Sequence, residues 1–325
     1  MPATMRAIVK PAAGAELALR DVPVPDVGPD EVRIDVSFCG ICGSDLHIED
    51  DAHPSSPPVV LGHEFSGVVD AVGADVEAFE PGDRVGFRHS WSPFPGVDGD
   101  GGFAEYMTAP ADVLCHVPED MTLELATLFE PVRPPLTIVR DVAELSAGET
   151  AVVSGPGPMG LLVTAAARLE EPDELRVLGT ESDRERRLPL AAELGADETL
   201  VFGEESLAAI EAEPPDVWFE TSGAPPAIEA AVEHVRPGGR VVCSGLGEGP
   251  WDVDMRRVAY RNLSIHGQWG GNDRYIPVAI EAMRSGTLEL EGLISDVVPL
   301  AEWERGFELA RSQQGIKVLL APDGS

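Results

Sequence analysis

The spacing of hydrophobic and polar positions changes after the first third of the chain. Up to about residue 130, short runs alternate between apolar and polar residues, as at 31–36 and 65–70, and turn residues such as those at 80–83 bound them. This pattern is typical of short strands in a β-rich domain. From about residue 150, short apolar runs alternate with amphipathic segments of helical period. That pattern predicts parallel strands joined by helices in a doubly wound α/β sheet.

The second pattern also places individual elements. The expected buried strands are residues 151–154, 175–178, 216–219 and 240–244, and the helices expected between them are residues 159–169, 184–194 and 226–235. Beyond residue 273, we expect two further helices and a closing strand, at residues 275–285, 301–311 and 316–320. A chain of 325 residues is long enough for two domains, each with its own core.

The net charge of the chain limits the kinds of molecule it can bind and indicates the kind of organism it comes from. The 57 acidic residues outnumber the 23 basic ones, which gives a net charge of −34, and only Lys10 and Lys317 are lysines. Such a field repels nucleic acid and anionic membranes, so neither is an expected partner. The acidic residues are spread among apolar ones, which predicts a folded, halophilic surface and excludes an acidic tail. With no signal-peptide pattern and no apolar run of ~20 residues, we expect a cytoplasmic protein.

A glycine-rich loop follows the first strand of the α/β region. Gly155, Gly157 and Gly160 fit the G-x-G-x-x-G pattern, with Pro158 and Met159 opening the next helix. In a strand–loop–helix context, these glycines allow a tight turn, a close approach of the backbone to a pyrophosphate, and close packing of helix on strand. The pattern predicts a dinucleotide site at this helix N-terminus.

The choice between NAD and NADP depends on the end of the second strand. An NAD site usually has an acidic residue there, but Gly179 occupies that place. Arg184 and Arg187 are near enough in sequence to meet a 2′-phosphate, whereas Glu181 could instead bind the ribose hydroxyls. We lean slightly to NADP. The expected contacts in this segment are Thr180, Glu181, Ser182, Arg184 and Arg187.

Two short motifs carry candidate metal ligands. The run from Cys42 to His47 includes Asp45, and His63 and Glu64 follow it, with His63 16 positions after His47. A thiolate, an imidazole and a carboxylate form a donor set suited to zinc, and a site with three protein ligands keeps one position open for chemistry. The alternative for Cys39 and Cys42 is a redox C-x-x-C pair, which the surrounding sequence does not favour. We expect Cys39, Cys115 and Cys243 to be ordinary small apolar residues.

These motifs resemble those of a known family. The residues at 42–47, 62–64, 81–85, 130–131, 155–160 and 316–318 resemble, in order, the zinc-dependent medium-chain dehydrogenases of the sorbitol, threonine and butanediol dehydrogenase type. The resemblance implies a GroES-like β-rich catalytic domain together with a Rossmann domain. It also implies a discontinuous catalytic domain, at residues 1–132 and 273–325, with the Rossmann NAD(P)-binding domain at residues 133–272.

The resemblance implies roles for individual residues. Cys42 and His63 would bind zinc, with either Glu64 or Glu130 as the carboxylate ligand, and the sequence leaves that choice open. Asp45 would accept a proton from His63 and fix its tautomer. On the same basis, Ser44 would hydrogen-bond the substrate oxygen and His47 would relay the released proton to solvent. The zinc would stabilise an alkoxide that passes a hydride to the nicotinamide.

Two departures from the family pattern stand out. Residues 86–101 lack the four cysteines that bind a structural zinc in most members, so we expect one catalytic zinc and no structural zinc. Homo-oligomerisation as a dimer or tetramer is a family-based expectation that this departure weakens. After Glu130, the run Arg133-Pro134-Pro135 replaces small apolar residues. We expect the prolines to delay or bend the following helix, and Arg133 to bring a charge near the nicotinamide.

We expect an oxidoreductase that depends on zinc and on NAD(P). Its expected substrate is a small-molecule secondary alcohol, either a polyol or a sugar-like compound. L-threonine 3-dehydrogenase and aldose (glucose) dehydrogenase are alternatives within the same class. A zinc-free quinone reductase is disfavoured, because such proteins lack the set of Cys42, His63 and Glu130. The alternative from another class is a catalytically inactive nucleotide-binding or redox-sensing protein, against which Ser44 and His47 argue.

Overall fold

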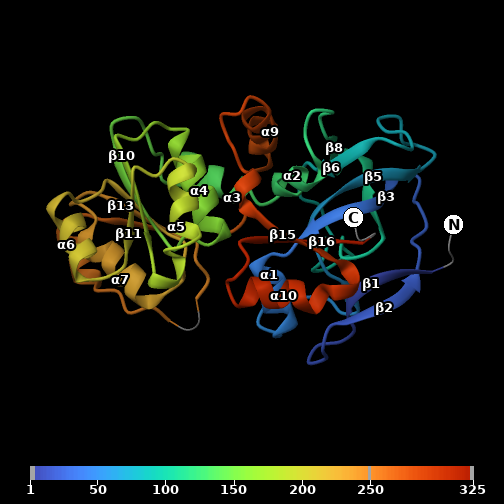
Figure 1. Ribbon diagram of the computed structural model, residues 1–325, viewed down its shortest axis with the longest axis horizontal. Coiled ribbons are helices and arrows are strands. Elements are labelled where there is room, and N and C mark those ends of the chain that lie inside the picture. The colour runs from blue at the N-terminus through green and yellow to red at the C-terminus, as the bar shows by residue number, and fades with distance from the viewer. Residues whose placement is uncertain (1–3, 248–249, 323–325) are drawn as a thin grey trace. The chain divides into compact units, whose positions relative to one another are not determined.

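A computed structural model describes residues 4–247 and 250–322. The chain divides into two compact units (Figure 1). The first contains the chain up to Pro131 and again from Ile294 onward, and the second is Val132–Leu293. None of the helices in the described part of the chain has the length and apolar character needed to cross a bilayer.

The first unit contains two sheets. A small one has the order β2-β1-β4 and a large one the order β15-β16-β3-β5-β6-β8, with β7 also paired to β3. All strand pairs are antiparallel except β15 with β16. The strands are β1 (Thr4–Lys10), β2 (Ala18–Pro23), β3 (Glu31–Gly40), β4 (Val59–Val60), β5 (Glu64–Val72), β6 (Arg84–Phe87), β7 (Tyr106–Pro110), β8 (Leu114–His116), β15 (Ile294–Pro299) and β16 (Lys317–Ala321).

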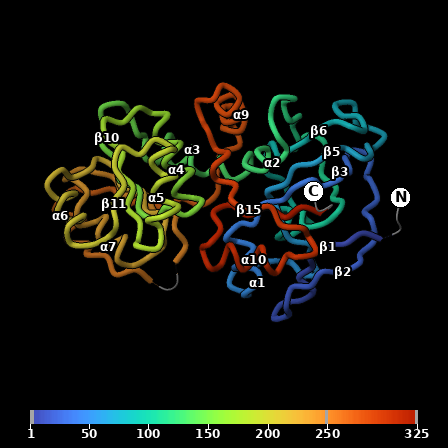
Figure 2. The backbone as a smooth tube through the Cα atoms, in the orientation of Figure 1, coloured from blue at the N-terminus to red at the C-terminus, as the bar shows by residue number. Residues whose placement is uncertain are grey.

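The end of the chain completes this unit. Strand β16 pairs with β3 through Leu319 opposite Gly40 and Leu320 opposite Cys39, and Figure 2 shows the late segment beside the early one. Leu319 and Ala321 pack with Phe38 in one buried cluster. The apolar run at 316–320 therefore forms the predicted strand, and its first residue, Lys317, is brought beside the start of β5.

Short helices complete the first unit: α1 (Gly43–Glu49), α2 (Leu123–Ala126), α10 (Trp303–Arg311) and 3-10 turns at Ala111–Val113, Thr127–Phe129 and Leu300–Glu302. The C-terminal end of α1 is held by two basic side chains. Lys10 Nζ donates to the carbonyl of Glu49, and Arg311 pairs with the carboxylates of Glu49 and Asp50. Cations at a helix C-terminus are favoured by its exposed carbonyls.

The second unit is built on one parallel sheet. Its strand order, β11-β10-β9-β12-β13-β14, is 3-2-1-4-5-6 in chain order, which is that of a Rossmann fold and confirms the predicted doubly wound sheet. The core beside the sheet includes Trp218, whose indole nitrogen donates to Ser154 Oγ at 2.9 Å. The strands are β9 (Thr150–Ser154), β10 (Glu174–Gly179), β11 (Glu198–Val201), β12 (Val217–Glu220), β13 (Arg240–Cys243) and β14 (Ser264–Gly267).

The helices of this unit match the predicted amphipathic segments in part. They are α3 (Arg133–Thr137), α4 (Pro158–Arg168), α5 (Arg187–Glu193), α6 (Glu204–Ala212), α7 (Pro225–His234), α8 (Met255–Arg261) and α9 (Ile276–Arg284), with 3-10 turns at Glu181–Asp183, Asp273–Tyr275 and Glu291–Leu293. Helix α5 begins three residues later than expected, because a 3-10 turn capped by Thr180 precedes it. Sequence patterns did not predict α6, α8, β11, β14 or, in the first unit, β15.

We expected the two prolines to delay or bend the helix after Glu130, and the structure shows no delay. Helix α3 begins at Arg133, and Pro134 and Pro135 lie in its first turn, where a missing N–H leaves no hydrogen bond unmade. The helix then widens into a π-helical turn at Ile138–Val142.

The compact units differ from the expected domains at the point where the chain returns to the β-rich unit. We expected residues 273–325 to belong with the β-rich domain, but the segment from 273 to 293 belongs to the second unit. Two contacts explain this: Asp273 pairs with Arg133, and the Tyr275 hydroxyl donates to Asp141 at 2.5 Å.

Candidate functional site

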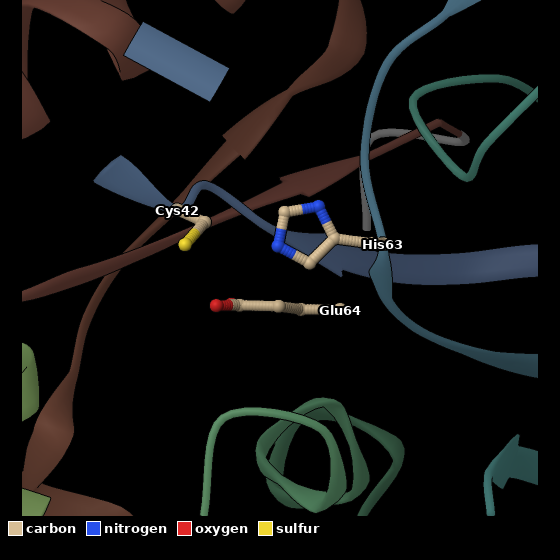
Figure 3. A group of neighbouring side chains, drawn as sticks. All are labelled: Cys42, His63 and Glu64. Atoms are coloured by element: carbon tan, nitrogen blue, oxygen red, sulfur yellow. The ribbon is translucent and has the colours of Figure 1, made fainter. Parts of the chain in front are cut away.

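Three metal-ligating side chains converge in the first unit. Cys42 follows β3 and stands at the N-cap of α1, and His63 and Glu64 stand at the start of β5. Antiparallel pairing places Gly40 opposite Glu64, which brings the two motifs together. The ligand atoms of Cys42, His63 and Glu64 lie within 4.8 Å of one another, and Figure 3 shows the three side chains pointing toward one another. Within the described residues, this is the group of three such side chains that could hold a metal ion.

Asp45 lies beneath the histidine of this group. Its Oδ2 accepts from the backbone N–H of Cys42 at 2.8 Å, while its Oδ1 is 3.8 Å from His63 Nδ1. That distance exceeds a hydrogen bond, and neither Oδ1 nor Nδ1 has a hydrogen-bond partner among the described residues. Burial alone would lower the pKa of His63, but the charge of Asp45 and contact with Cys42 outweigh it and raise that pKa to about 10.

Glu64 has a partner from the far end of the chain. Both of its carboxylate oxygens accept from Lys317 Nζ, at 2.8 and 2.7 Å, and both side chains are almost fully buried. Burial would lower the pKa of Lys317, but the negative charges of Glu64 and Cys42 outweigh it and raise the pKa. Glu130 is also buried and acts electrostatically on His63 and Lys317, but it lies outside the group that converges within 4.8 Å.

The charges of this region fit a bound cation. Three buried carboxylates, those of Asp45, Glu64 and Glu130, face two groups that can carry positive charge, His63 and Lys317. Ionisation of Cys42 would add another negative charge. Buried anions need compensating cations, and sulfur, imidazole nitrogen and carboxylate oxygen are donors that zinc takes. The residues present therefore fit a zinc ion, with Cys42, His63 and Glu64 as the nearest donors.

Ser44 and His47 lie on α1, next to the converging group. Both are partly exposed, and helix α1 carries them on the same short segment as Asp45. Phe94, which the sequence did not single out, packs on the imidazole of His63 with ring centroids 5.6 Å apart. Its neighbour in the loop, Trp91, packs on Phe65 and Phe87 instead. The loop that lacks the four family cysteines is thus fastened by aromatic contacts beside the metal ligands.

The glycine loop has the geometry that its sequence predicts. Gly155 adopts a φ of +92°, and a side chain there would meet Ser222 at 2.6 Å. A Cβ on Gly160 would lie 2.0 Å from the carbonyl oxygen of Gly155, so helix and loop touch there. In contrast, a Cβ on Gly157 would meet nothing within 4 Å. The space left open at Gly157, at the N-terminus of α4, fits a pyrophosphate, with Pro158 and Met159 in the first turn.

The end of β10 holds the candidate ribose contacts. Thr180, Glu181 and Ser182 are exposed, and Glu181 forms a double hydrogen bond with the exposed Arg184, at 2.8 and 2.9 Å. The Arg184 guanidinium lowers the pKa of Glu181. Arg187 differs from Arg184, because it is buried and lies 3.6 Å from Asp183.

The remaining residues singled out from sequence have structural surroundings. Arg133 is buried and paired with Asp273, so its charge is compensated within the second unit. Cys39 is buried, and Cys115 and Cys243 are partly buried. Burial raises the pKa of Cys115 and Cys243 to about 12, and that of Cys39 is also raised.

Comparison with known proteins agrees with this arrangement. A family model described as the alcohol dehydrogenase GroES-like domain matches residues 28–119, and one described as zinc-binding dehydrogenase matches residues 158–285. These matches confirm the GroES-like assignment of the β-rich part and the expected fold class.

Full-length relatives give the same result. L-threonine 3-dehydrogenase of Anaeromyxobacter sp. (strain Fw109-5) is 33% identical over 346 residues, covering 97% of this chain and 99% of the relative. D-arabitol-phosphate dehydrogenase of Enterococcus avium is 30% identical over 347 residues, covering 98% of each. A protein of Sinorhizobium meliloti 1021, described as a zinc-binding dehydrogenase and solved with NADP bound, superposes with a TM-score of 0.87 at 26% identity, covering 99% of this chain and 100% of that one. The chain therefore belongs to the zinc-dependent medium-chain dehydrogenases, a family of NAD(P)-linked alcohol dehydrogenases.

Proposed function

We propose that this protein oxidises a polyol or sugar-like secondary alcohol and transfers the hydride to NAD(P). The observation that carries the proposal is the convergence of Cys42, His63 and Glu64 within 4.8 Å, in a chain that also has an open glycine loop. A bound zinc ion would act as a Lewis acid that lowers the pKa of the alcohol. The relative that acts on D-arabitol phosphate supports a polyol-like substrate.

The residues around the donor set would share the remaining work. Asp45 would orient His63 through its charge, since its Oδ1 lies 3.8 Å from Nδ1. The Ser44 hydroxyl would hydrogen-bond the substrate oxygen and take up its proton while giving its own to the relay. His47, on the same helix, would pass the released proton to solvent. Glu130, buried near His63, would remain an alternative carboxylate ligand.

The cofactor proposal leans to NADP. Thr180, Ser182 and the exposed Arg184 would contact a 2′-phosphate, which requires Arg184 to exchange Glu181 for that phosphate. The buried Arg187 would hold the turn through Asp183 instead of meeting the ligand directly. Glu181→Ala should then raise the ratio of the affinity for NADP to the affinity for NAD. Arg184→Ala should lower that ratio.

A turnover assay tests the proposed reaction. Purified protein in about 2 M KCl with zinc would be screened for reduced-cofactor formation with polyols, sugars and L-threonine, each with NAD and NADP. We expect turnover with a polyol or sugar and none in Cys42→Ala. A folded, zinc-loaded protein without turnover on any pair would instead favour a catalytically inactive nucleotide-binding or redox-sensing protein.

L-threonine 3-dehydrogenase is the second candidate, favoured by the 33% identity to such an enzyme over nearly the whole chain. An amino-acid substrate needs a group that binds its carboxylate, so the same screen separates the two candidates by whether L-threonine or a neutral polyol reacts. Aldose (glucose) dehydrogenase is distinguished by turnover of the sugar alone.

We also propose that the protein is a cytoplasmic homo-oligomer with one catalytic zinc and no structural zinc per chain. The absence of cysteine from residues 86–101 supports the single zinc, which metal analysis would test. Strand β14 supports association, because it lies at the edge of its sheet and its four residues, Ile265 among them, are exposed. Light scattering should report at least a dimer, and Ile265→Lys on that strand should weaken it.

The acidic surface supports a halophilic source. A net charge of −34 on a folded chain with two lysines is tolerable where salt screens the repulsion. We propose that the protein works at high intracellular salt, and its salt dependence is the test.

A further inference from the structure

Lys317 uses its full hydrogen-bonding capacity inside the first unit. Its Nζ donates to Glu64 Oε1 at 2.8 Å, to Glu64 Oε2 at 2.7 Å and to the carbonyl of Ile41 at 3.2 Å. A lysine ammonium has three N–H donors, so these three bonds account for all of them. Lys317 is 3% exposed and Glu64 is 1% exposed, and water therefore screens their attraction little.

The composition of the chain sets this lysine apart. Of the 23 basic side chains, 21 are arginines, and the other lysine, Lys10, is also buried. Lys10 Nζ lies 3.0 Å from Asp51 Oδ1 and 2.9 Å from the Glu49 carbonyl oxygen. This chain carries arginine wherever a basic side chain is exposed. Lysine occurs at two positions, and at each its compact ammonium group contacts a carboxylate and a backbone carbonyl. A planar arginine guanidinium is larger and has a different geometry.

The position of Lys317 has an electrostatic consequence for the donor set. The carboxylate that it holds lies within 4.8 Å of the ligand atoms of Cys42 and His63. A buried cation next to this carboxylate offsets its negative charge and competes with a metal ion for its lone pairs. Without Lys317, Glu64 would be a buried, unpaired anion beside the metal ligands, and its strongest available partner would be the metal.

We propose that Lys317 is a positioning residue that restrains Glu64, limits how tightly this carboxylate binds zinc, and so keeps a coordination position available to the substrate alcohol. The inference rests on the proposed zinc-dependent function. It assigns to the C-terminal strand β16 a part in setting the metal's reactivity.

The test compares Lys317→Met with the wild-type holoenzyme in high salt. Zinc release to a chelator should become about tenfold slower or more, because a cation has been removed beside the metal. The absorption spectrum of the cobalt-substituted variant should shift, since Glu64 takes a larger share of the metal. Turnover should fall through kcat, while the affinity for the dinucleotide, which binds in the other unit, should be unchanged.

Lys10→Met is the matched control. It removes the other buried, carboxylate-paired lysine of the same unit, and should lower thermal stability without changing zinc release or the cobalt spectrum. Zinc release from Lys317→Met that is as fast as in the wild type, or faster, would overturn the proposal.

A second pair of variants keeps the proposal testable if Lys317→Met does not fold. Glu64→Gln removes the carboxylate through which Lys317 is proposed to act, and should release zinc faster than the wild type because a ligand is lost. Adding Lys317→Met to Glu64→Gln should then leave zinc release nearly unchanged. A tenfold slowing on that addition would show that Lys317 acts on the metal directly and would contradict the inference. A wild-type protein that binds no zinc would contradict the proposed function itself, so the two failures are distinguishable.

Discussion

At the scale of single residues, the four cysteines have different environments. Cys42 is partly exposed at the start of α1, whereas burial holds the pKa of Cys115 and Cys243 at about 12 and that of Cys39 above its ordinary value. The thiolate, and not the neutral thiol, is the nucleophile that reacts with alkylating reagents. At pH 8, a thiol with a pKa of about 12 is ionised in roughly one molecule in ten thousand.

These environments predict selective alkylation. Metal-depleted, folded protein treated with iodoacetamide at pH 8 in high salt should be modified at Cys42 and spared at the other three cysteines. Zinc should protect Cys42, because the metal occupies the sulfur. Because burial raises the pKa of Cys115 and Cys243, their modification in the folded protein should stay much slower than that of Cys42 and should speed up as the pH is raised. Peptide mass mapping measures each site, and rapid labelling of Cys39 at pH 8 would contradict the buried placement.

Asp45 gives a second prediction at this scale. Asp45→Asn keeps an oxygen that can accept from the Cys42 N–H but removes the charge 3.8 Å from His63 Nδ1. We expect the affinity for zinc to fall by about 10–100-fold, as is typical when a partner of a ligating histidine is replaced. Competition with a chromogenic chelator measures it. Unchanged affinity would show that packing of Phe94 alone orients the imidazole.

At the scale of elements, the glycine loop allows a paired test. Gly160→Ala should destabilise the protein by about 1–3 kcal/mol, because its Cβ would lie 2.0 Å from the carbonyl oxygen of Gly155. Gly157→Ala should leave stability within about 0.5 kcal/mol, since Gly157 has a φ of −71° and open space around it. Its cost should appear in the affinity for the dinucleotide. Thermal unfolding and cofactor titration separate the effects, and equal stability losses would refute the assignment of space at Gly157.

Local patterns account for the elements that were predicted and for those that were missed. Strand β9, the glycine loop and helix α4 are contiguous, so their order and spacing identify them. Helix α8 has no buried residue and strand β14 has four exposed ones, so neither carries the periodic apolar signal that prediction requires.

The candidate site shows the same limit. Cys42, His63 and Glu64 are 22 residues apart or fewer and belong to recognisable motifs. Lys317 is 253 residues from Glu64, and only the pairing of β16 with β3 brings them together. Phe94 lies in a loop without a motif, and its contact with His63 depends on how that loop folds back. Long-range partners of this kind leave no local signal.

At the scale of the whole molecule, charge decides stability. With a net charge of −34, repulsion among surface carboxylates opposes the compact state, and salt shortens its range from about 10 Å at 0.1 M to about 3 Å at 1 M. The melting temperature should rise continuously with KCl between these concentrations and beyond. NaCl at equal ionic strength should act similarly, and sucrose much less. A melting temperature that is constant or falls with added salt would contradict a halophilic origin.

The burial of both lysines also decides how the folded molecule meets amine-directed reagents. Lys10 and Lys317 are 0% and 3% exposed, so acylating dyes, glutaraldehyde and succinimidyl cross-linkers find no lysine amine at the surface. Immobilisation on an amine-reactive support would likewise find no lysine of the folded chain to attach. Lysine acylation can therefore be used to detect unfolding. A lysine is acylated only in molecules whose β-rich unit has opened, so the extent of labelling measures how often this unit unfolds.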